Sequence, residues 1–183
     1  MTTLYLRTVN ADYTSHGGFK WPREIGAVVE APDWDPAPVC GGGLHGLPWG
    51  QGHLNLLSSA DDAVWLVVAA DHAVRIDNDK SKFPRCTIVY VGTRDGACAY
   101  LLERAPRDVA VPYVHVTVGY RGAATAGDEG TATAGAGGTL VIAYSDKTRR
   151  RRLCVGYVGE DGIMPGTAYQ VINGKLTKAE FTS

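Results

Sequence analysis

Residues 119–142 read as three consecutive octads, G-Y-R-G-A-A-T-A (119–126), G-D-E-G-T-A-T-A (127–134) and G-A-G-G-T-L-V-I (135–142). Glycine occupies the first and fourth positions of each octad, and small or β-branched residues fill most of the last four. Four strand residues joined by a four-residue turn are typical of a solenoid or narrow β-roll, in which each unit stacks on its neighbour. The strict phase favours an ordered β-repeat over a disordered Gly/Ala linker, with the glycines in turns that need positive φ.

The octad pattern extends in both directions into ordinary β-structure. Residues 111–118, V-P-Y-V-H-V-T-V, fit the strand half without the glycines. After the octads, 139–144 and 150–158 predict one hairpin, and Asn173-Gly174 predicts a second between 168–172 and 175–178. The run Arg149–Arg152 lies at this first hairpin, where alternate arginines indicate a solvated sheet edge rather than a nucleic-acid patch.

The first 110 residues predict a small mixed region. Helices are expected over 50–58 and from Asp95, as the N-cap, to about 104. Strands are expected over 4–9, 25–30, 63–70, 73–77 and 86–91. The predicted fold class is therefore α+β and mostly β: a mixed α/β region, a short solenoid-like octad repeat and C-terminal hairpins. The corresponding domains are a mixed α+β domain with a Gly-rich loop (1–110), an octad β-repeat (111–142) and a hairpin cap (143–183).

The overall composition indicates which cell compartment and which binding partners to expect. The chain has 183 residues, 45% of them hydrophobic, and a formal net charge of -1, which gives no global attraction to nucleic acid or to an anionic membrane. The first ten residues do not read as a signal peptide, and the apolar run 63–70 is too short to span a bilayer. We expect a cytoplasmic protein with no membrane partner.

The four cysteines do not indicate a metal centre. They contain no C-x-x-C pair, and Cys40 with His45 would supply only two ligands. Free buried thiols in a reducing cytoplasm explain them more simply. Neither a metal site nor a cofactor is predicted.

The order of these features resembles a group of uncharacterised phage and prophage proteins. The resemblance implies a phage or prophage gene acting in the bacterial host cytoplasm, and it implies no known activity. Leu44 stands where that group usually has phenylalanine. The matching stretches are Gly18-Phe19, Cys40 with Gly43-Leu44-His45, 82–92, the octads, and the tail 156–169.

A candidate ligand site is centred on the glycine run at 41–43. Consecutive glycines expose backbone N–H groups that can form an anion nest, and a helix beginning near Gly50 would add donors. Histidines would hydrogen-bond a phosphate or ribose, tryptophans would stack on a base, and Lys80 and its neighbours would return to the same cleft. The proposed ligand-binding residues are Gly42, Gly43, Leu44, His45, Trp49, His53, Arg7, Trp21, Lys82 and Arg85.

This loop matches no established nucleotide-binding signature. It has neither the G-x-x-x-x-G-K-[ST] pattern nor a G-x-G-x-x-G after a strand. The competing interpretation is a tight structural loop whose histidines satisfy backbone groups.

Three functions remain open at the level of sequence. The first is a phage-encoded protein that captures a nucleotide-type host molecule, sequestering a defence signal. The second is an ADP-ribosyltransferase-like or other nucleotide-processing enzyme, by loose analogy with Arg7 on a first strand and a Gly-x-His loop, with Glu103 as the acid. The third is a structural, self-assembling repeat protein. No catalytic residue is assigned, and the flat repetitive second half predicts a homo-oligomer.

Overall fold

A computed structural model describes residues 2–76, 80–106 and 108–180. The chain divides into two compact units, Met1–Ala105 (unit 1) and Pro106–Ser183 (unit 2). Strands hold 42% of the residues and helices 9%, which confirms the predicted α+β, mostly β class. The finer division at residues 110 and 142 stays a prediction.

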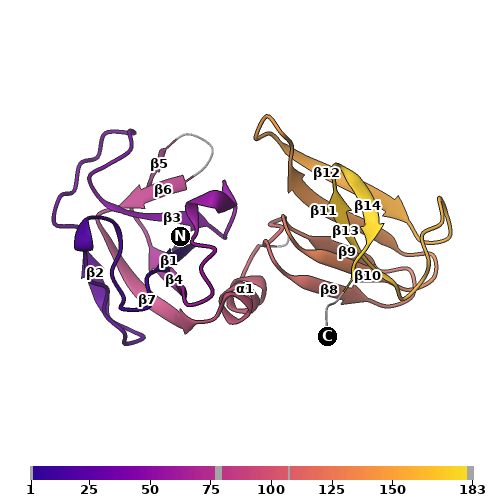
Figure 1. The fold of residues 1–183 in the computed structure, drawn as a ribbon, viewed down its shortest axis with the longest axis horizontal. Helices are drawn as coiled ribbons and strands as arrows, with labels where there is room; N and C mark the ends of the chain where they lie inside the picture. Colours follow the sequence, from indigo (N-terminus) through magenta and orange to yellow (C-terminus); the bar gives the residue numbers. More distant parts are fainter. Residues whose placement is uncertain (1, 77–79, 107, 181–183) are drawn as a thin grey trace. The chain divides into compact units, whose positions relative to one another are not determined.

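Unit 1 is built on one seven-stranded antiparallel sheet with the order β2-β7-β4-β1-β3-β6-β5 (Figure 1). Its strands are β1 (Thr3–Val9), β2 (Val28–Glu30), β3 (Leu44–Pro48), β4 (Val64–Ala70), β5 (Val74–Ile76), β6 (Lys80–Phe83) and β7 (Arg85–Gly92). Two short 3-10 helices, η1 (His16–Gly18) and η2 (Leu54–Leu56), and one α-helix, α1 (Arg94–Leu102), complete it.

The central strand β4 explains why this sheet is stable. Leu66, Val67 and Val68 are fully buried, so both faces of the strand are covered, as the apolar run predicts. Helix α1 packs against β4 and β7 and buries Leu101. Among the described residues no helix is long and apolar enough to cross a membrane.

Three local predictions in unit 1 are wrong. The predicted helix over 50–58 is only the single turn η2, because Gly50 (φ 73°) and Gly52 (φ 140°) have positive φ values that are incompatible with a right-handed helix. The strand predicted over 25–30 begins at Val28, after a positive φ of 92° at Gly26. Helix α1 is capped by Thr93, whose side chain accepts from the Gly96 N–H, and not by Asp95.

In unit 2 the octads form two-sheet coils. The strands are β8 (His115–Val118), β9 (Ala123–Ala126), β10 (Thr131–Ala134) and β11 (Thr139–Ser145). Strand β10 pairs in parallel with β8, and β11 pairs in parallel with β9, both in register. The strand of each octad therefore pairs with the strand of the octad two units along the chain. It does not pair with that of the neighbouring octad, as predicted, because each four-residue turn moves the chain to the opposite sheet. One coil comprises two octads.

Small residues fill the interior of the coils. Ala124, Ala126, Ala132 and Ala134 are at most 1% exposed; they alternate with exposed residues along β9, and with the buried Thr131 and the half-buried Thr133 along β10. The thin interior is closed at one end by larger side chains of β11, of which Leu140 is fully buried. Alanine at alternate positions is thus required by the close approach of the two sheets.

The glycines at the first and fourth octad positions serve close packing rather than positive φ, which corrects the sequence prediction. The left-handed residue of each turn is the third one, for example Arg121 (φ 54°) and Glu129 (φ 60°). A Cβ on Gly127 would lie 2.4 Å from the carbonyl oxygen of Val111, and one on Gly138 would lie 2.8 Å from that of Gly122. Glycine is needed where the backbone of one turn rests on the turn of the preceding coil.

Two antiparallel hairpins cap the second coil (Figure 1). Strand β12 (Arg151–Tyr157) adds to β11, and β13 (Ala168–Ile172) with β14 (Lys175–Lys178) adds to β10. The sheet orders are β14-β13-β10-β8 and β12-β11-β9. Strand β12 is an edge strand, as the arginine run predicts.

Candidate functional site

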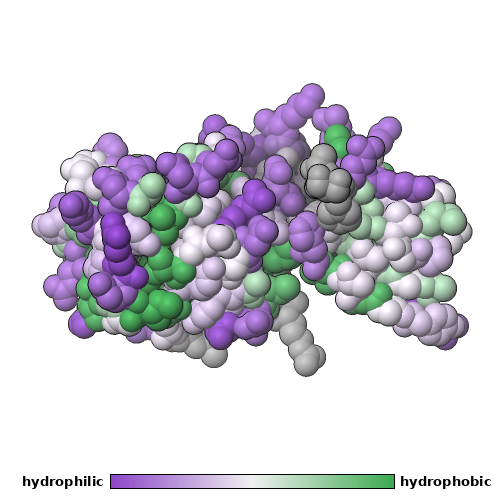
Figure 2. All heavy atoms as spheres, turned by 60° about the horizontal axis from the view of Figure 1, so that its bottom comes forward, coloured by the Kyte–Doolittle hydropathy of each residue, from purple (hydrophilic) through white to green (hydrophobic). Residues whose placement is uncertain are grey.

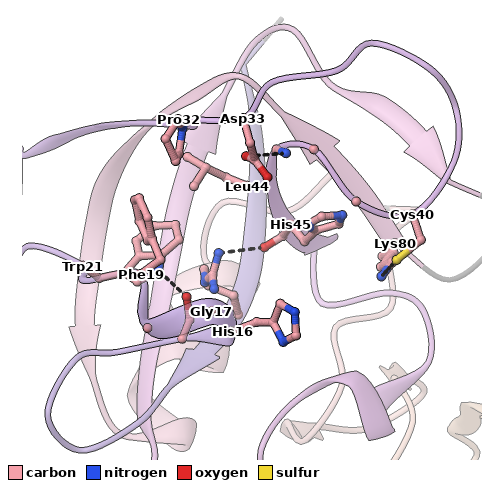
Figure 3. A pocket seen from close by; sticks show the side chains of 16 residues that line it. His16, Gly17, Phe19, Trp21, Pro32, Asp33, Cys40, Leu44, His45 and Lys80 are labelled. Carbon is pink, nitrogen blue, oxygen red and sulfur yellow. Dashed lines mark hydrogen bonds between the residues drawn. The ribbon is translucent and has the colours of Figure 1, made fainter.

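One cleft of unit 1, with a volume of about 690 Å³, is lined by several of the predicted site residues. It is lined from three directions: by the η1 turn, by the loop before β3, and by strands β1, β3 and β6 (Figure 3). Phe19 and Trp21 lie on one side of the close-up, and Cys40 and Lys80 lie on the other. The cleft therefore has an apolar side and a polar side.

Arg7 connects the two sides of the cleft. Its guanidinium carbon lies 3.7 Å from the centre of the Trp21 ring, and its Nη1 donates to the carbonyl oxygen of His45 at 3.1 Å. Burial lowers the pKa of Arg7 to about 9, so the guanidinium keeps its charge at neutral pH. The sequence places this arginine on β1, where alternation directs it away from the fully buried Leu6.

His45 lies on β3 directly opposite Lys82 of β6. Its pKa is lowered to about 4, first by burial of the ring and then by the positive charges of Lys80 and its cationic neighbours. The ring is therefore neutral at pH 7. Its Nε2 atom is buried and has no hydrogen-bond partner among the described residues.

The low pKa of His45 predicts an acid-sensitive fold. The folded-state value of about 4 lies below the ordinary 6.5, so between these values the unfolded chain binds the proton more readily. The free energy of unfolding is expected to be fully retained above pH 6.5 and to fall as the pH is lowered towards 4. Urea titrations at pH 7.5, 6 and 5 measure this slope, and His45→Gln should flatten it. Equal slopes in the parent and in His45→Gln would contradict the assignment.

The glycine run at 41–43 is held by the protein's own groups. Gly41, Gly42 and Gly43 all have positive φ, as predicted, but the Gly43 N–H donates to Asp33 Oδ1 at 3.1 Å. The fully buried Lys82 donates from Nζ to the Gly41 carbonyl oxygen at 2.8 Å. These internal partners, and the absence of the predicted helix start at Gly50, favour the structural interpretation of the loop.

The structure brings together part of the predicted site. Six of the ten residues line the cleft: Arg7, Trp21, Gly42, Gly43, Leu44 and His45. Lys82 lies beneath the loop, 5.9 Å from the centre of the Trp34 ring. The remaining three are not among the residues that line this cleft. Trp49 follows β3 and His53 precedes η2. Arg85, on β7, forms an ion pair with Glu30 of β2 at 3.7 Å.

Sequence reasoning missed several residues that line the cleft, notably His16, Pro32 and Asp33. The proline- and aspartate-rich connector was a detectable signal, because such residues form turns that fold back on strands. No local pattern linked η1 to the glycine run.

Enzyme chemistry gains no support from the described residues. Glu103 lies at the C-terminal end of α1, where it is exposed and pairs with Arg104 at 2.9 Å, and it is not a cleft residue. The Cys40 thiol is exposed, not buried as expected, and accepts from Lys80 Nζ at 3.1 Å. Within the part of the chain that the structure describes, no three metal-ligating side chains cluster.

The cleft lies in a part of the chain that matches a known protein family. Residues 3–98 match the model of a family described as Domain of unknown function (DUF7666). The chain belongs to this family. The match lies within unit 1 and contains all the residues that line the cleft, so the cleft is part of the DUF7666 domain.

The chain is also similar in sequence to curated bacterial proteins. Over 110 residues the chain is 37% identical to an ice nucleation protein of Pseudomonas fluorescens and to ice nucleation protein InaU of Pantoea ananas. These alignments cover 58% of this chain and 9% and 10% of the relatives, so the chain spans about a tenth of their length. Unit 2 is less than half of the chain, so an alignment of this length extends into unit 1. No solved structure matches the chain.

These relatives correct the leading functional prediction. The relatives are named ice nucleation proteins of bacteria, so the predicted phage protein that captures a nucleotide-type defence signal is wrong. The phage or prophage family suggested by the resemblance is not confirmed.

Proposed function

We propose that the chain is a small ice-active protein, in which the octad coils of unit 2 present ordered rows of threonine to water. The observation that carries this proposal is the in-register parallel stacking of octads in a chain related to ice nucleation proteins. Those relatives are named ice nucleation proteins, and we propose activity of the same class for this chain.

The outward faces of the coils support an interaction with water. Because the alanines point inward, alternate residues point outward: Thr117 and Thr133 are register partners on β8 and β10, and Thr125 of β9 lies in the other sheet beside Val141. Neighbouring strands are about 4.8 Å apart, and residues two apart on a strand are separated by roughly 6.6 Å. In our proposal the hydroxyl and methyl groups of these outward threonines order the water next to them.

The charge distribution also suits this role. Between residues 111 and 142 the ionised side chains are Arg121, Asp128 and Glu129, and all three lie in turns. Figure 2 shows that pale, weakly polar residues cover much of the visible face of unit 2. The strand faces formed by residues 111–142 therefore carry no lysine, arginine, aspartate or glutamate.

Self-association would enlarge this surface. Strands β8 and β9 are the outer strands of their sheets, whereas the opposite end of the stack is capped by hairpins. As terminal strands of their sheets, β8 and β9 suit strand-to-strand pairing with a second copy across a two-fold axis. We therefore propose a homo-oligomer whose joined coils form a longer threonine array than two coils provide.

The proposal is tested by ice recrystallisation and droplet freezing with the full chain. The parent is expected to slow recrystallisation and to raise the freezing temperature of supercooled droplets, more strongly at concentrations where it associates. Thr117→Lys and Thr125→Lys place charges on the exposed outward rows and should reduce both effects several-fold.

Thr177→Lys is the matched control, because Thr177 is an exposed strand residue of β14 outside the octads. It should behave like the parent. Ice growth and freezing identical to those with an inert protein of the same concentration would overturn the proposal.

A further inference from the structure

The cleft of unit 1 combines a cationic end with an apolar side. Arg7 and Lys80 line it together with the ring of His45. Phe19 and Trp21 lie on the side of the cleft opposite Lys80, with Arg7 stacked on Trp21, and their ring centres are 5.7 Å apart in an edge-on arrangement (Figure 3). A cavity of this volume, mostly apolar with a few convergent polar groups, is typical of a small-molecule site.

Two buried polar atoms in this cleft lack partners. Arg7 Nε and His45 Nε2 are buried without a hydrogen bond, and both side chains line the cleft. Buried polar atoms in proteins are nearly always hydrogen-bonded, because leaving one unsatisfied costs about 1–3 kcal/mol. Among the described residues the Arg7 Nε–H lacks an acceptor, and Nε2 of the neutral His45 ring lacks a donor or an acceptor according to its tautomer, so a polar ligand group bound next to these side chains would supply a missing partner.

The net charge of the side chains that line the cleft indicates the kind of ligand. The ionised side chains that line the cleft are Arg7, Lys80 and Asp33, which leave one net positive charge. Asp33 is already engaged with the Gly43 N–H, and among the described residues neither cation forms an ion pair with a carboxylate. One net charge beside aromatic rings matches a monoanion with an apolar body, and not a multiply charged phosphate compound.

We propose that the DUF7666 domain of this chain binds a small organic acid in this cleft, with the carboxylate against Arg7 and Lys80 and the apolar body against Phe19 and Trp21. A guanidinium holds a carboxylate through charge-assisted hydrogen bonds, and its stacking on Trp21 fixes its plane. This site lies in unit 1 and does not depend on the function proposed for unit 2.

The experiment uses the full chain with 3-phenylpropionate as the probe and isothermal titration calorimetry as the readout. The neutral isostere 3-phenylpropan-1-ol has the same apolar body and should bind at least tenfold more weakly. Inorganic phosphate should bind more weakly than the probe. Binding of phosphate alone, or equal affinities for the acid and the alcohol, would overturn the proposal.

Single-residue variants distinguish a loss of ligand binding from a loss of overall stability. Arg7→Met should weaken binding of 3-phenylpropionate at least tenfold while leaving the melting temperature nearly unchanged, because the loss of its hydrogen bond to the His45 carbonyl oxygen is offset by removal of a cation that has no carboxylate partner among the described residues. Arg23→Met is the matched control, since Arg23 also stacks on an aromatic ring, that of Tyr13 at 4.6 Å, but does not line the cleft. Lys80→Met, on a less buried side chain, should also weaken binding. Unchanged affinity in both Arg7→Met and Lys80→Met would contradict the assignment.

Discussion

Gly127→Ala is expected to destabilise unit 2 by on the order of 3 kcal/mol, the upper part of the range for overpacking. The added Cβ would lie 2.4 Å from the Val111 carbonyl oxygen and 2.5 Å from its carbon, which are backbone atoms that cannot rotate away. The φ of Gly127 is not positive, so the expected cost is steric and not conformational. Thermal melting followed by far-UV circular dichroism measures it, at about 4–8 °C for each kcal/mol.

Gly119→Ala is the matched control, because Gly119 holds the same octad position in the first coil. A Cβ there would meet nothing within 4 Å, since no earlier coil lies beneath that turn. The control should therefore melt like the parent. Similar losses in both variants would mean that the glycines act through turn conformation, and the stacking of turns would lose its support.

Phe83→Ala is expected to destabilise unit 1 by about 3–5 kcal/mol, the usual range for truncating a buried phenylalanine. Phe83 is fully buried on β6, and its ring centre lies 4.9 Å from that of Tyr5. The strand also carries Lys80 and Lys82, so loosening it should disturb the cleft. All four tryptophans (Trp21, Trp34, Trp49 and Trp65) lie in unit 1, so tryptophan fluorescence during urea unfolding reports the loss.

Two controls define that result. Phe83→Leu keeps most of the buried volume and should cost clearly less than Phe83→Ala. Val39→Ala removes methyl groups from a side chain that is 56% exposed and should change stability by no more than about 0.5 kcal/mol. A Phe83→Ala protein as stable as Val39→Ala would show that β6 is not part of a packed core.

Gly127→Ala and Phe83→Ala also test the division into two units. Because unit 2 contains no tryptophan, Gly127→Ala should lower the melt seen by circular dichroism with little change in tryptophan fluorescence.

The amino-acid sequence by itself determined the parts of the fold that depend on local chemistry. The octad phase located the strands of unit 2, because glycines and short turns recur at a fixed period. Asn173-Gly174 fixed the last hairpin, since Asn173 (φ 51°) and Gly174 (φ 77°) adopt the left-handed conformations that such a turn requires. The apolar run 63–70 identified the central strand β4, because only a strand covered on both faces is apolar throughout.

Tertiary structure alone decided the rest. Strand β3 contains Gly46 and Pro48 and shows no strand pattern, yet it is held between β1 and β6 by ladder hydrogen bonds. The pairing of every second octad, and the need for glycine at Gly127, arise from contact between backbones of successive coils. The cleft joins residues from η1, β1, β3 and β6, which no spacing along the chain relates. Local propensity is worth a fraction of a kcal/mol per residue, so burial and pairing with distant segments override it wherever they conflict.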